Sequence, residues 1–145
     1  MAVYYLDEEL MERMCHRLAV AVFDTKDDPI ASFKDHSELL NSALNLPRQN
    51  FAGQELYPTI VDKAAILFYV LNKNHPFRNG NKRISAASLL VFLYINEMWL
   101  DAGKTEIVEK TLNIARSEAS KKDEVVAEIK KWIKDHLVSI SAVKQ

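Results

Sequence analysis

The sequence predicts an all-α fold, a single compact helical domain of about six helices over residues 1–145. Two observations predict it. The few turn-forming residues, 3 Gly and 4 Pro, separate long segments whose apolar residues recur at helical spacing. No repeat, low-complexity segment or linker divides the chain, and its hydrophobic content of 48% suits one globular core.

Apolar periodicity justifies each helix in turn. The first segment places Leu10 and Met14 on one face, and a second, short helix is expected to begin at Asp35, with Glu38 completing a capping box. The segment 81–99 is apolar nearly all round, which is typical of the buried central helix of an all-α domain. The expected helices cover residues 6–23, 35–44, 59–72, 81–99, 105–119 and 122–137.

Two other segments are expected to lack helix. Residues 24–28, followed by Pro29, have the composition of a turn. Residues 47–58 form the longest irregular stretch, which contains Gly53 and is expected to form a short flap or hairpin before the next helix.

Composition and charge exclude several functional classes. The formal net charge of -1 gives no global basic field of the kind that binds nucleic acid. The single cysteine, Cys15, excludes an internal disulfide and suits a reducing compartment. The longest apolar run, residues 86–95 apart from Ser88, is far shorter than the roughly 20 residues that cross a bilayer. We therefore expect a cytoplasmic protein that contacts neither membrane nor nucleic acid.

The stretch from His75 to Arg83 carries the strongest functional signal. It reads His-Pro-Phe-Arg-Asn-Gly-Asn-Lys-Arg and leads directly into the apolar segment 81–99, so three cations lie at or just before a helix start. A helix N-terminus carries partial positive charge and normally attracts acidic residues. A bound anion such as a phosphate chain would compensate the three cations, Arg78, Lys82 and Arg83.

This stretch resembles the signature of the Fic/Doc family, His-x-Phe-x-Asp/Glu-x-Asn-x-Arg. Lys82 stands where typical Fic members carry Gly, so the ending is more similar to the Doc, or death-on-curing, branch. The resemblance extends upstream through Phe51-Ala-Gly-Gln-Glu-Leu-Tyr-Pro58 and covers roughly residues 47–99. It implies a Fic/Doc-like helical domain with a flap before the pair of helices that carries the active site.

The resemblance also implies a role for each residue of the stretch. His75 matches the catalytic histidine, which accepts the proton of an attacking hydroxyl. Phe77 matches the structural anchor of the loop. The positions expected to bind nucleotide phosphates are Arg78, Gly80, Asn81, Lys82 and Arg83.

Asn79 departs from the family pattern, which has Asp or Glu there to hold Mg²⁺. An amide oxygen can bind this ion but lacks the charge of a carboxylate. Three interpretations stay open: weak binding through Asn79, replacement by another residue, or impaired activity.

The family resemblance further implies two kinds of protein partner. The flap would pair with an extended peptide of the target, and its residues are Asn50, Phe51, Ala52, Gly53, Gln54 and Glu55. The helix motif that restrains many family members, Ser/Thr-x-x-x-Glu-Gly/Asn, is absent: Lys110 follows the segment 105–109, which has the spacing. A separate antitoxin protein is therefore expected to regulate the activity.

The sequence as a whole favours a Doc-like toxin that transfers a phosphoryl group from ATP to a hydroxyl of a protein such as a translation elongation factor. Two alternatives stay open. One is nucleotidyl transfer (AMPylation) by the same residues, with the nucleotide reversed. The other is a degenerate member that binds nucleotide or a partner without catalysis, which Asn79 favours.

Overall fold

Two helices joined by a short loop, α4 (Ile60–Lys73) and α5 (Asn81–Ile95), form the centre of the fold. In the computed structural model, which describes residues 2–143, every residue from Lys63 to Asn72 is buried. α5 is buried along most of its length, as its apolar composition predicts. The short loop between these helices is therefore held at one end of the core.

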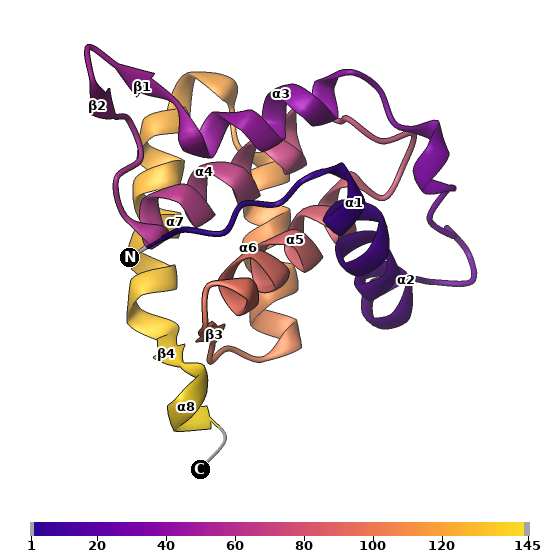
Figure 1. Ribbon diagram of the computed structural model, residues 1–145. Coiled ribbons are helices and arrows are strands. Elements are labelled where there is room, and N and C mark those ends of the chain that lie inside the picture. Colours follow the sequence, from indigo (N-terminus) through magenta and orange to yellow (C-terminus); the bar gives the residue numbers. More distant parts are fainter. Residues whose placement is uncertain (1, 144–145) are drawn as a thin grey trace.

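The remaining helices, except the C-terminal α8, pack around this pair (Figure 1). The N-terminal helix runs on from α1 (Glu8–Leu10) through a π-helical turn, η1 (Met11–His16), into α2 (Arg17–Phe23). The other helices are α3 (Leu39–Asn45), α6 (Lys104–Arg116), α7 (Lys122–His136) and α8 (Ile140–Val143), with 3₁₀ turns η2 (Phe33–Asp35), η3 (Leu46–Arg48) and η4 (Ala119–Lys121). The all-α prediction is confirmed.

Strands are confined to two small antiparallel pairs. β1 (Asn50–Phe51) and β2 (Gln54–Glu55) form a hairpin that projects from one corner of the molecule (Figure 1). β3 (Met98–Leu100) pairs with β4 (Leu137–Ser139) and joins the end of α5 to the end of α7. The hairpin is the flap that the sequence predicts.

One helix start was placed incorrectly from the sequence. Asp35 lies in η2 rather than at the cap of a helix, and α3 begins at Leu39 without the expected capping box. The backbone N–H of Ser37 donates to the carbonyl oxygen of Pro76 at 2.8 Å, and the Ser37 hydroxyl accepts from Leu39 N at 3.2 Å. This contact with the distant loop after α4 holds the segment extended and delays the helix.

The central helix also ends earlier than predicted. α5 stops at Ile95, because the side-chain amide of Asn96 donates to the carbonyl oxygens of Phe92 and Tyr4 and accepts from Tyr4 N. Glu97 follows with φ of +63°, which turns the chain into β3. Residues 98–99, predicted as helix, therefore pair with β4 instead.

Asp62 at the start of α4 makes stability depend on pH. Its carboxylate forms a capping box with Thr59 and an ion pair with Lys130 Nζ at 2.8 Å. Burial alone would raise the pKa of Asp62, but hydrogen bonds from Lys130 and Thr59 outweigh it and lower the pKa below its ordinary value.

We expect Asp62→Asn to lower the free energy of unfolding by about 1 kcal/mol at pH 7. Because the folded pKa is lowered, the stabilisation is present above the ordinary pKa near 4 and is lost as the pH falls through the folded pKa. Urea unfolding from pH 7 to pH 3 measures this difference, which should shrink at the acid end. A difference between the two proteins that stays constant over this range would contradict the assignment.

Within the described residues, no helix is long and apolar enough to span a bilayer.

Candidate active site

The stretch His75 to Arg83 forms the loop between α4 and α5 and the first turn of α5. His75 has φ of +50° and an exposed side chain, directly after the helix ends. The next two residues are buried, and the ring of Phe77 lies 5.8 Å from that of Phe33, centroid to centroid. Phe77 thus anchors the loop to the core while His75 faces solvent.

The side chain of Asn81 closes this loop. Its amide oxygen accepts from Phe77 N at 2.9 Å, and its amide nitrogen donates to Phe77 O at 3.0 Å. Asn81 is only 7% exposed. The side chain predicted to bind phosphate is therefore engaged by the loop, and the contribution left to Asn81 is its backbone N–H at the first turn of α5.

Gly80 sets the start of α5. It is the N-cap residue with φ of +71°, a conformation that favours glycine, and the first helical bond runs from Ile84 N to Gly80 O at 2.8 Å. No side chain of residues 2–143 caps this end of the helix. The first N–H groups of α5 are therefore free to receive an anion.

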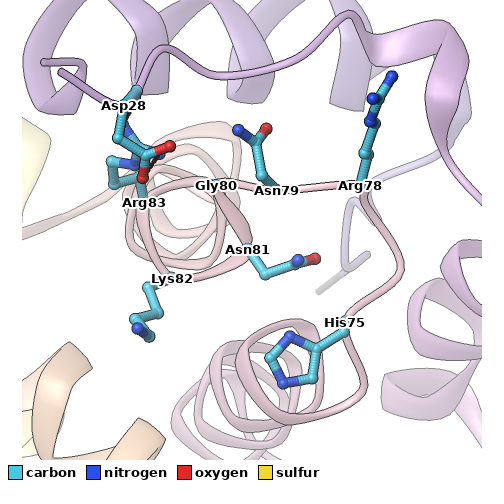
Figure 2. A pocket seen from close by; sticks show the side chains of 8 residues that line it. All are labelled: Asp28, His75, Arg78, Asn79, Gly80, Asn81, Lys82 and Arg83. Atoms are coloured by element: carbon cyan, nitrogen blue, oxygen red, sulfur yellow. Dashed lines mark hydrogen bonds and ion pairs between the residues drawn. The ribbon is translucent and has the colours of Figure 1, made fainter. Parts of the chain in front are cut away.

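These residues line a pocket of about 240 Å³ at the start of α5 (Figure 2). His75 lies on one side of the pocket and Arg83 on the other, with Lys82 between them at the helix start. Lys82 is exposed and forms no ion pair with any residue in the described part of the chain. The lining residues are Asp28, His75, Arg78, Asn79, Gly80, Asn81, Lys82 and Arg83.

Arg83 is held by acidic residues of the turn after α2. Its guanidinium donates to Asp24 Oδ1 at 3.2 Å, to Asp28 Oδ2 at 3.0 Å and to the backbone carbonyl of Asp28 at 2.6 Å. Arg78, by contrast, is exposed and lies 3.9 Å from a carboxylate oxygen of Asp35. The sequence predicted the turn but provided no sign that it contacts Arg83.

The amide of Asn79 is also bound within the protein. It accepts from Ala31 N at 2.7 Å and donates to Pro29 O at 2.9 Å. In Figure 2 the side chain points away from His75, toward the segment that carries Asp28. Both ends of the Asn79 amide are thus engaged by backbone groups of residues 29–31, and a Mg²⁺ ion bound here would share the amide oxygen with Ala31 N.

Comparison with known proteins now decides the family. The model of the Fic/DOC family matches residues 5–93, which is more than half of the chain. The chain belongs to the Fic/Doc family. A relative described as "Toxin Doc", from Mycolicibacterium smegmatis, is 34% identical over 92 residues, which cover 63% of this chain and 71% of the relative. No solved structure matches.

The flap of this Fic/Doc protein is a hairpin whose strands are exposed. Asn50 pairs with Glu55 and Phe51 with Gln54. The turn residues Ala52 and Gly53 both have positive φ, at +52° and +81°, as two-residue hairpin turns require. Phe51 is 74% exposed and is available to contact another molecule.

A buried lysine, to which the sequence analysis assigned no role, fastens the flap to α4. Lys63 Nζ donates to Glu55 Oε1 at 3.0 Å, to Pro47 O at 3.3 Å and to Tyr57 O. The Lys63 side chain is only 1% exposed. A lysine among the apolar residues of a helix was the available signal, because buried cations require partners.

Cys15, the single cysteine, is buried in the core of this Fic/Doc protein. Burial raises the pKa of the Cys15 thiol to about 12. The thiol therefore stays protonated at neutral pH and is unsuited to nucleophilic chemistry.

We expect Asn79→Asp, the change toward the usual Fic/Doc signature, to lower the free energy of unfolding by about 1 kcal/mol. A carboxylate can accept from Ala31 N but cannot donate to Pro29 O. Urea unfolding with and without Mg²⁺ measures the effect. A gain in stability on adding Mg²⁺ to the variant, absent in the wild type, would show instead that the new carboxylate binds the ion.

Proposed function

We propose that this protein is a Doc-like toxin that transfers the γ-phosphoryl group of ATP to a hydroxyl side chain of a target protein. One observation carries the proposal: an exposed histidine lies beside an uncapped helix start that also bears Lys82 and Arg83, around one pocket. Free N–H groups and cations at a helix start favour a phosphate chain. The relative described as Toxin Doc supports the choice within the family.

The residues around the pocket have separate roles in this reaction. His75 accepts the proton of the target hydroxyl as its oxygen forms a bond to the γ-phosphorus. The bond from this phosphorus to the bridging oxygen breaks, and ADP leaves with the electron pair. Lys82, Arg83 and the first N–H groups of α5 stabilise the charge on the phosphate oxygens. Positioning and electrostatic stabilisation therefore account for the catalysis, without a step that uses Asn79.

The flap is proposed to hold the target. An extended peptide can add as a strand to the exposed edge of the hairpin, and exposed Phe51 offers an apolar contact beside it. Because the flap precedes the start of α4 and His75 follows its end, about 20 Å away along the helix, the target would extend along α4 to bring a Ser, Thr or Tyr hydroxyl to His75. A translation elongation factor is the target we propose to test first.

The test incubates the purified protein with Mg²⁺ and bacterial extract, and separately with purified elongation factor, using γ-labelled or α-labelled ATP. Label from γ alone on one protein band, absent in the His75→Asn variant, is the expected result. Label from α would instead establish nucleotidyl transfer, which the same phosphate-binding residues would serve. Absence of His75-dependent label with ATP binding retained would show a binding protein without catalysis, in keeping with the structural role of Asn79.

Regulation by a separate antitoxin protein is part of the proposal. An apolar groove beside Lys82 and Arg83, lined by Phe23, Ala86 and Leu112, supports a site for a helix of such a partner. Expression of the chain alone should arrest growth of the host cells. Co-expression of the antitoxin should restore growth, and arrest that persists would contradict this arrangement.

A further inference from the structure

The segment from Asp24 to Ala31, here called the strap, lies against the signature loop at three positions. The amide of Asn79 holds the backbone of its end, at Pro29 O and Ala31 N. A Cβ added to Gly80 would lie 3.0 Å from Ile30 Cγ1, so Ile30 packs directly on the helix start. The third contact is made by Arg83.

The guanidinium of Arg83 donates hydrogen bonds to the strap with the same N–H groups that would bind a phosphate. One guanidinium nitrogen contacts Asp24 and the backbone carbonyl of Asp28, and the other contacts the Asp28 carboxylate at 3.0 Å. The fork of donors on arginine fits carboxylates and phosphates alike. Asp28 also lines the pocket itself. A phosphate and Asp28 therefore require the same donors.

The two carboxylates differ in how firmly they are held. Asp24 Oδ1 also accepts from Ile30 N at 3.0 Å, and the Asp24 side chain is only 26% exposed. Asp24 is therefore fixed by the backbone of the strap as well as by Arg83. The side chain of Asp28 is 70% exposed, and its carboxylate contacts Arg83 alone among the described residues. The Arg83 side chain is 17% exposed, but the Asp28 end of the pair is open to solvent, which screens it and leaves Asp28 displaceable by a more highly charged anion.

We propose that the strap is an intramolecular competitor for the phosphates of the nucleotide, with Asp28 occupying Arg83 until the nucleotide displaces it. The amide of Asn79 holds the strap in place. A carboxylate at this position could not donate to Pro29 O, which explains why this chain has Asn where the family signature has Asp or Glu. The inference rests on the proposed role of Arg83 in phosphate binding.

The test measures ATP affinity by calorimetry for the full chain, in EDTA and in Mg²⁺, at physiological salt. Asp28→Asn is expected to bind ATP about two- to fivefold more tightly than the wild type in both conditions, the equivalent of one exposed ion pair. Asp27→Asn is the matched control, since Asp27 is exposed on the same turn and forms no ion pair within residues 2–143. Its effect should be less than half as large, because solvent screens its charge.

A second readout does not depend on nucleotide. Phenylglyoxal should modify Arg83 faster in Asp28→Asn than in Asp27→Asn, and mass spectrometry locates the modified residue. Equal ATP affinities in these two variants would overturn the competition, and so would weaker binding in Asp28→Asn, which would make Asp28 a ligand of the nucleotide or its metal. Failure of the proposed function looks different: no His75-dependent transfer, although the affinity shift is present. Absence of ATP binding in every variant would overturn both.

Discussion

Replacing His75 by Asn is expected to reduce protein labelling from ATP by about 10²- to 10⁴-fold, the range for loss of a general base. An Asn side chain cannot accept the proton of the target hydroxyl. Asn is also one of the residues that tolerate positive φ, so the variant keeps the backbone conformation at φ of +50°.

The measurement compares initial labelling rates at saturating ATP, with matched controls for folding and binding. Because the His75 side chain is exposed, the melting temperature and ATP affinity of the variant should equal those of the wild type. Retention of more than about a tenth of the rate would contradict the role of His75 and require another base.

Replacing Lys63 by Met is expected to lower the free energy of unfolding by about 2–4 kcal/mol. Methionine fills a similar volume but provides no donor for the carbonyl oxygens of Pro47 and Tyr57 or for the carboxylate of Glu55. The base of the flap would lose the interaction that fastens it to α4.

Urea unfolding measures the loss, and hydrogen exchange locates it. The amide of Leu56, which bonds to Gln49 O at 3.0 Å beside the hairpin, should exchange faster in the variant. Lys131→Met, on the exposed face of α7, is the control and should change stability by less than about 0.5 kcal/mol. An equally small change for Lys63→Met would show that water replaces its contacts.

Local signals in the sequence were sufficient for most of the helices and for the setting of the signature. The periodicity of apolar residues located α4, α6 and α7 to within a few residues. Turn residues located the hairpin around Gly53 and the loop before Gly80. These features depend on neighbours in the chain, which a single sequence displays.

The errors have a common cause in contacts between distant residues. Asp35 failed to cap a helix because Ser37 bonds to Pro76, and α5 ended early because Asn96 bonds to Tyr4. Hydrogen bonding also engages the side chain of Asn81, which bonds to the backbone of Phe77, while the prediction that Asn81 binds phosphate stays a prediction for its backbone N–H.

By itself, the sequence determined the fold class, the family signature and the place of His75 after a helix, since periodicity, turn chemistry and motif spacing are local. Tertiary structure alone decided the partners of the polar groups. Arg83 meets Asp28 across 55 positions, and Asn79 meets Pro29 across 50. The physical reason is that a cation or an amide can pair with any suitable group within hydrogen-bonding distance. Only the folded chain determines which group lies at that distance.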